Sequence, residues 1–287
     1  MRCEKPPARM PAPRIGSKWG RHSCLPLLLI TLLSAQTLTF TPVTRPIVEE
    51  RLKQYAGDNS AREATLKQLF EKAGCPADGL TEQPVKHSKN PNVICTLPEP
   101  DASTIVVGAH FDRVAAGQGV VDNWSGASLL PSLLQALLLN KRRHTFVFVG
   151  FTDEEEGLVG SAFYVKQLSK GQKQSIRAMV NMDTLGLGST LIWASKGDPQ
   201  LTRLFLTLAG SMHSPAAVMN VDRVGSADSE SFRQAGIPSL TIHSVTRDTW
   251  NILHSSRDKI EQIHMDEYYQ TYTLIVAYLA YLDMKLD

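Results

Sequence analysis

The chain has 287 residues, of which 43% are hydrophobic and 20% charged, a globular composition that suits one large domain or two small ones. Its formal net charge of +2 comes from the N-terminus, where six basic residues before Leu25, against the single acid Glu4, leave the remainder at about −3. This slightly acidic remainder has no basic stripe to neutralise phosphates, so we expect no nucleic-acid partner.

Residues 1–35 are predicted to be a secretory signal peptide. A basic lead precedes the apolar run 25–33 and the small residues Ser34 and Ala35, which is the order of a cleaved signal. The apolar run is about half of the ~20 residues that a membrane span needs. An uncleaved N-terminal anchor is the alternative, and we expect no other membrane association. The sequence thus predicts a secreted or periplasmic protein with a single domain over residues 36–287.

Helical and strand patterns alternate along the rest of the chain. Strands are predicted over 92–97, 104–108, 146–151, 177–182, 191–193 and 237–242, and helices over 46–55, 60–74, 123–139, 158–170, 200–209, 230–235 and 266–286. In the second helix, Ser60 and Glu63 form a candidate capping box, and Gly74 is a candidate C-cap. This alternation predicts an α/β fold with a mixed, mainly parallel sheet that has helices on both faces.

The strand predicted over 146–151 ends in four consecutive acids, Asp153 to Glu156, followed by Gly157. Carboxylates crowded at the end of a buried strand repel one another, so a positive charge is expected nearby. In open α/β sheets the functional crevice lies outside the carboxyl ends of the strands. We therefore hypothesise that these acids belong to a metal site. An acidic helix N-terminus would also account for them.

Other candidate ligands follow further strands and loops. His110 and Asp112 follow the strand over 104–108, Asp183 follows the strand over 177–182, and Asp122 and His254 lie in loops. Each of these residues alone is a weak signal, because turns and surfaces commonly carry such side chains. Together, carboxylates and imidazoles at one rim of the sheet predict a metal centre.

The segments AHFD, VDNWSG, DEEEGLVGS, NMDTLG and LHSSRD, in this order and spacing, resemble the co-catalytic zinc aminopeptidases of metallopeptidase family 28 over about residues 92–258. The resemblance implies a zinc-exopeptidase (phosphorylase/hydrolase-like) fold and two zinc ions. It implies that His110 and Asp183 bind one zinc and that Glu155 and His254 bind the other. Asp122 would bridge the two ions.

The resemblance also implies two residues that do not bind metal. Glu154 would be the general base that deprotonates a water bridging the zinc ions, and Asp112 would orient His110. Elementary geometry agrees, because residues i and i+2 of a strand face the same way and adjacent residues such as Glu154 and Glu155 point apart. The expected substrate is a peptide or aminoacyl compound with a free N-terminus.

Two other functions share this resemblance. A glutaminyl cyclase would use one zinc for acyl transfer, and a non-catalytic relative would have kept only the fold. The chain also departs from the family pattern. Ala227-Asp228-Ser229 stands where Ser-Asp-His is common, which puts a substrate role there in doubt, and Asp258 is either a support for the His254 loop or a turn residue.

Several residues stay open or are assigned to structure. Cys75 and Cys95 either pair or are separate buried thiols. Trp193 is expected in the core, whereas Trp124 and Trp250 could wall a specificity pocket. His243 is expected to make a structural hydrogen bond rather than line a pocket. The expected surface histidines are His87, His144 and His213.

Overall fold

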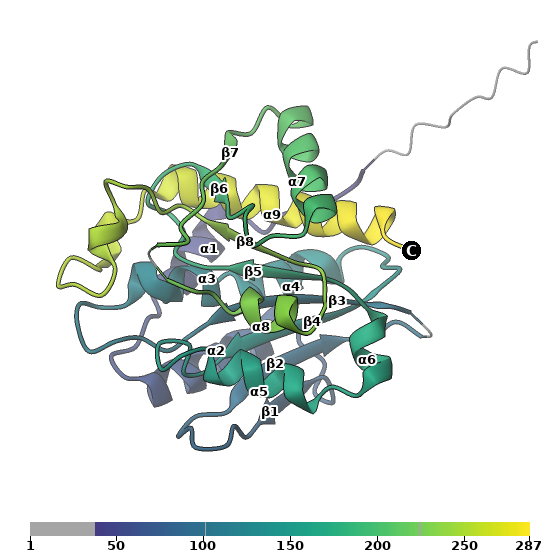
Figure 1. Ribbon diagram of the computed structural model, residues 1–287, viewed down its shortest axis with the longest axis horizontal. Coiled ribbons are helices and arrows are strands. Elements are labelled where there is room, and N and C mark those ends of the chain that lie inside the picture. The colour runs from purple at the N-terminus through teal and green to yellow at the C-terminus, as the bar shows by residue number, and fades with distance from the viewer. Residues whose placement is uncertain (1–37, 101, 224) are drawn as a thin grey trace, which may run out of the picture. The chain divides into compact units, whose positions relative to one another are not determined.

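A mixed sheet is the centre of the computed structural model, which describes residues 38–100, 102–223 and 225–287 (Figure 1). The predicted signal peptide lies outside the described residues, and Leu38–Asp287 packs as one unit. In these residues eight strands lie in the order β1-β2-β4-β3-β5-β8-β6-β7. Their bounds are β1 Leu80–Gln83, β2 Asn92–Leu97, β3 Thr104–His110, β4 Thr145–Phe151, β5 Ile176–Met182, β6 Thr190–Ile192, β7 Ala216–Val218 and β8 Ser239–His243.

The middle of the sheet is parallel. β4, β3, β5 and β8 run side by side in one direction, whereas β2 is antiparallel to β4 and β6 is antiparallel to β8. The predicted mixed, mainly parallel α/β fold is therefore confirmed. β1 and β7 were not predicted, because both are short and largely solvent-facing and so carry no apolar alternation.

Helices cover both faces of the sheet. The larger core packs α1 (Arg45–Leu52), α2 (Asn59–Ala73), α4 (Leu130–Leu138), α7 (Pro199–Ser211) and α9 (Met265–Lys285) against one face. α5 (Val159–Gln167) and α8 (Ser229–Gln234) cover the other face with a smaller core around Tyr164 and Phe232, and α6 (Lys170–Ser175) lies beside β5 (Figure 1). None of the described helices is both long and apolar enough to span a bilayer.

The predicted start of α2 was wrong by one residue, and the predicted cap was wrong by two. Asp58 caps the helix by accepting a hydrogen bond from the Ala61 amide at 2.9 Å. Ser60 lies inside the helix, where its hydroxyl accepts a hydrogen bond from Asn90. Gly74 ends the helix with a φ of 95°, as predicted, because glycine adopts this left-handed conformation without a Cβ clash.

The single helix predicted over 123–139 is broken in the structure. It divides into η1 (Val120–Trp124), α3 (Ser125–Ala127) and α4, which has Pro131 in its first turn. Asp122 and Asn123 have non-helical backbone angles inside η1. The apolar pattern continues across the break because every one of these segments is buried, so hydrophobicity alone could not locate it.

Two further points were open or wrong in the sequence analysis, the state of Cys75 and Cys95 and the position of His144. Cys75 and Cys95 form a disulfide that joins the end of α2 to β2, with 6.1 Å between their Cα atoms. His144 is buried rather than on the surface, and its Nδ1 lies 3.1 Å from Oδ1 of Asp283 in α9. The expectation of a surface residue failed because α9 covers a turn that looks polar in the sequence.

Candidate metal centre

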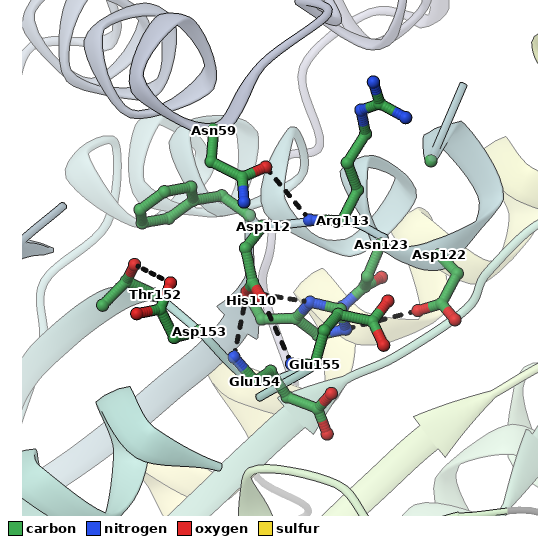
Figure 2. Close-up of polar contacts among 12 residues, drawn as sticks. Asn59, His110, Asp112, Arg113, Asp122, Asn123, Thr152, Asp153, Glu154 and Glu155 are labelled. Atoms are coloured by element: carbon green, nitrogen blue, oxygen red, sulfur yellow. Dashed lines mark hydrogen bonds and ion pairs between the residues drawn. The ribbon is translucent and has the colours of Figure 1, made fainter. Parts of the chain in front are cut away.

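The parallel strands β3, β4 and β5 end at the same edge of the sheet, and the predicted ligands come together there. Figure 2 shows three of them, His110, Asp122 and Glu155. His110 is the last residue of β3, the acidic turn follows β4, and Asp183 follows β5. Asp122 arrives from η1 and His254 from the loop before α9. Two overlapping sets form, which we call the His110 group (His110, Asp122, Asp183) and the His254 group (Asp122, Glu155, His254).

The His110 group is the more buried of the two. Nε2 of His110 lies 3.3 Å from Oδ1 of Asp122 and 3.9 Å from Oδ1 of Asp183. In the His254 group, Nε2 of His254 lies 3.3 Å from Oδ2 of Asp122 and 2.8 Å from Oε2 of Glu155. The two oxygens of Asp122 therefore face different histidines. Within each group one ligand atom per residue lies within 4.8 Å of the others, close enough to share an ion.

Hydrogen bonds with Asp258 and with the end of β5 hold the backbone around Asp122. Asp258 is buried, and its carboxylate accepts hydrogen bonds from the amides of Val121 at 2.8 Å and Asp122 at 3.1 Å. Asn123 donates to the Met182 carbonyl and accepts from the Thr184 amide, which links η1 to the end of β5. Asp258 therefore fixes the backbone at Asp122. The sequence analysis had considered it as a support for the His254 loop or as a turn residue, and neither alternative included this contact.

Arg62 in α2 is a positioning residue that the sequence analysis did not find. Its guanidinium is fully buried and donates to the main-chain carbonyls of Phe111, Gln118 and Gly119 at 2.6–3.1 Å. It also lies over the ring of Trp124, 5.6 Å from the centroid. These bonds fix the loop between His110 and Asp122. An arginine in an amphipathic helix ordinarily faces water, so its local sequence carries no signal of this contact.

Asp112 shapes the acidic turn (Figure 2). Its carboxylate oxygens accept hydrogen bonds from the amides of Glu154 at 3.1 Å and Glu155 at 3.2 Å. Its Oδ1 also lies 3.3 Å from Nδ1 of His110, without the alignment of a hydrogen bond. The acids do not sit in the first turn of α5, which has no acidic residue there. The alternative of an acidic helix N-terminus is therefore excluded.

Two neighbouring acids of the turn after β4 resist ionisation, whereas the two histidines hold the pKa of Asp122 below its usual range. Burial, reinforced by Asp228 and Asp183, raises the pKa of Glu154 to about 10, and burial with Asp122 raises the pKa of Glu155 to about 7. One oxygen of Glu155 is buried and accepts no hydrogen bond from the described residues. Such a cluster has more negative charge than the protein neutralises, as expected of a cation site.

The two histidines, in contrast to Glu154 and Glu155, favour their charged forms. The hydrogen bond to Asp122 raises the pKa of His254 to about 9. Burial disfavours a charged His110, but Glu154 and the other surrounding carboxylates outweigh this and raise its pKa well above 6.5. Protons therefore compete with cations for the same nitrogens.

A cavity of about 350 Å³ opens at the candidate ligands. Glu154 lines it beside the ligands, and its other walls are largely apolar, formed by Trp193, Val221, Val245, Trp250 and Leu253. Trp193 is buried, as expected, and also lines this cavity.

Of the other tryptophans and histidines considered in the sequence analysis, some line the cavity and one lies in the core. Trp124 is fully buried in the core, away from the cavity. Trp250 is 50% exposed and stands at the cavity wall. His243 makes the predicted structural hydrogen bonds, to the Met219 carbonyl and from the Val245 amide, and lines the cavity as well.

Asp228, which keeps the family pattern between the departures at Ala227 and Ser229, is fully buried behind the site. Neither carboxylate oxygen has a hydrogen-bond partner among the described residues. Burial raises the pKa of Asp228 to about 7. It is absent from the residues that line the cavity, so the doubt about a substrate role there remains.

Known proteins resemble this chain in sequence and in fold. It is 26% identical over 215 residues to a probable leucine aminopeptidase of Arthroderma benhamiae, covering 70% of this chain and 60% of that protein. The chain therefore spans less than two thirds of the length of that relative.

Two solved structures share the fold. The LapA aminopeptidase of Legionella pneumophila has a TM-score of 0.70 at 20% identity and covers 89% of this chain and 79% of its own. An Acidobacteriales bacterium glutaminyl cyclase has a TM-score of 0.71 at 17% identity and covers 88% of this chain and 99% of its own. At such identities both comparisons establish the architecture and do not separate the two activities.

The family model of Peptidase family M28 matches residues 92–279, which is more than half of the chain and contains all five candidate ligands. The chain belongs to peptidase family M28.

Proposed function

We propose that this protein is a metal-dependent aminopeptidase that holds two zinc ions at the described rim. The observation that supports this most strongly is the position of Asp122, whose two oxygens face His110 and His254 separately. A carboxylate so placed can bridge two cations. The His110 group would hold one ion and the His254 group the other.

The residues fit zinc. Imidazole nitrogen and carboxylate oxygen are accepted zinc ligands, and three protein ligands for each ion leave a position open for water or substrate. The three carboxylates of the two groups, with Glu154, are balanced in charge by two divalent cations. When bound, the pair of ions would supply Lewis acidity, which polarises a carbonyl and lowers the pKa of water.

Glu154 is the proposed general base. It lines the cavity beside the ligands, whereas its neighbour Glu155 contacts His254, so the two adjacent acids have separate tasks. Cations in the two groups would lower its raised pKa toward the neutral range in which a base works. Glu154 would take a proton from the attacking water and deliver it to the nitrogen of the departing peptide.

The cavity suits a peptide N-terminus. With zinc bound, the free α-amine of the substrate would take an open position on one ion, and the apolar wall formed by Val221, Val245 and Leu253 can take the side chain of the first residue. The leucine aminopeptidase to which the chain is similar agrees with an apolar first residue. We also propose an oxidising location, secreted or periplasmic, which the disulfide between Cys75 and Cys95 supports.

The test is hydrolysis of leucyl-alanine amide by the purified full chain, with metal content measured on the same sample. We expect two zinc ions per chain, release of leucine, loss of activity with chelator and recovery with zinc. A chain that binds one zinc and converts an N-terminal glutamine to pyroglutamate, with release of ammonia, would be a cyclase instead. Hydrolysis that is insensitive to chelator would exclude the metal mechanism.

A further inference from the structure

The cavity at the candidate metal centre continues beyond Trp250. A second hollow of about 630 Å³ shares Val221 and Trp250 with it as lining residues. Arg223 and Arg247 also line this second hollow, and both are exposed. The two hollows are therefore neighbouring parts of one cleft, with the acidic rim in the first part and two arginines in the second.

The arginines of the second hollow form no ion pair with the carboxylate beside them. Asp222 lines the same hollow, but its oxygens accept hydrogen bonds from the Ser195 hydroxyl at 2.8 and 2.9 Å and one from Nε1 of Trp193 at 3.2 Å. Among residues 38–100, 102–223 and 225–287, no carboxylate oxygen lies within 4.0 Å of a nitrogen of Arg223 or Arg247. Their guanidinium groups are therefore available to an anion that enters the cleft.

The order of groups along the cleft matches a short peptide. The metal centre in the first part would hold the free α-amine of the substrate, whereas Arg223 and Arg247 make the second part positive. A di- or tripeptide in extended form measures about 7–10 Å and carries an ammonium at one end and a carboxylate at the other. A guanidinium is well matched to a carboxylate, because it can donate two parallel hydrogen bonds.

We propose that the hollow beyond Trp250 is a subsite for a carboxylate of the peptide substrate, bound by Arg223 and Arg247. This inference rests on the proposed aminopeptidase function. Val221 and Trp250 form the apolar wall between the rim and the subsite. The carboxylate is either the C-terminus of a short peptide or an acidic side chain, and the chemistry of recognition is the same for both.

The experiment compares four substrates with the zinc-loaded enzyme: Leu-Ala, Leu-Ala-amide, Leu-Glu-amide and Glu-Ala-amide. We expect at least one carboxylate-bearing substrate to exceed Leu-Ala-amide in kcat/KM by about tenfold, a value at the low end for hydrogen bonds to charged groups because the arginines are exposed. Arg247→Gln and Arg223→Gln should each remove most of this advantage and change the rate with Leu-Ala-amide less than about twofold. The advantage should also shrink in about 0.5 M salt.

The matched control is Arg203→Gln, an exposed arginine of α7 that is absent from the lining of both hollows. It should leave the preference intact. If the Arg223→Gln and Arg247→Gln variants lose rate with Leu-Ala alone, the bound group is the C-terminus. If they lose rate with Leu-Glu-amide or Glu-Ala-amide, the bound group is an acidic side chain. Calorimetric titration of Leu-Ala and Leu-Ala-amide into Glu154→Gln, with and without Arg247→Gln, measures the same preference as binding affinity.

Two outcomes would overturn the subsite, and they can be told apart. Equal kcat/KM for all four substrates, unchanged in both arginine variants, would remove the carboxylate subsite and leave the aminopeptidase function standing. No hydrolysis of any of the four by the zinc-loaded enzyme would overturn the proposed function and the subsite together.

Discussion

The two halves of the candidate metal centre are built differently. The His110 group draws on the ends of two adjacent strands, and its ligands are buried or nearly so. The His254 group depends on a turn and a long loop, and the His254 side chain is 57% exposed. Rigid strand ends keep their geometry without a ligand, whereas a loop orders its ligand at a cost in entropy. The difference teaches that one half of the site is preformed and that the other is adjustable.

The largest expected effect lies outside both halves. Glu154→Gln should lower kcat by about 10²–10⁴-fold, because it removes the proton acceptor and leaves the ligand atoms in place. Metal analysis should still find two zinc ions per chain. Glu156→Gln, an exposed acid in the same turn, is the control and should keep full activity. Normal turnover by Glu154→Gln would show that another group acts as the base.

A paired substitution tests the comparison directly. His254→Ala should weaken binding of one zinc by at least about 100-fold and, above about pH 9 where the native imidazole is neutral, leave the melting temperature of the metal-free protein unchanged. His110→Ala should weaken zinc binding by a similar factor and also lower that melting temperature, because it empties a buried position. Zinc titration and thermal unfolding of both variants supply the measurements. Equal melting temperatures for the two variants would contradict the claim that only one half is preformed.

Arg62 stabilises the His110 group without being one of its ligands, so its substitution tests that half of the site. Arg62→Met should lower the free energy of unfolding by about 2–4 kcal/mol, because it leaves several main-chain carbonyls without their donor. Zinc affinity of the His110 group should fall with it. Urea unfolding provides the measurement, with Arg203→Gln as the control. Unchanged stability would mean that water replaces the guanidinium.

The smallest effect is a dependence of stability on pH. Glu155, with a pKa of about 7, and His254, with a pKa of about 9, bind protons in the folded protein that the unfolded chain has already released. The metal-free protein should therefore lose stability as pH rises through about 4.5–7 for the acid and about 6.5–9 for the histidine. Zinc replaces these protons, so the gain in melting temperature on zinc addition should grow over the same range. A zinc effect independent of pH would contradict the cluster as described.

Local patterns in the sequence were sufficient for the parts of the site that follow strands. His110, Glu155 and Asp183 each come just after an apolar run, so both the strand and its end could be predicted. Arg62 and the burial of His144 depend on contacts with residues 49 or more positions away, which no local pattern records. The break before α4 escaped for a different reason, because burial on every side erases helical periodicity.

Arg62 lies in the first turn of α2, and Cys75 follows the end of the same helix. Both residues precede residue 92, where the family match begins. A fragment trimmed to the matched residues would therefore lack the guanidinium that fixes the loop between His110 and Asp122. In a reducing host the full chain would keep this guanidinium but lose the covalent tether of its helix to β2. Recombinant production should accordingly retain residues 38–91 and use an oxidising compartment.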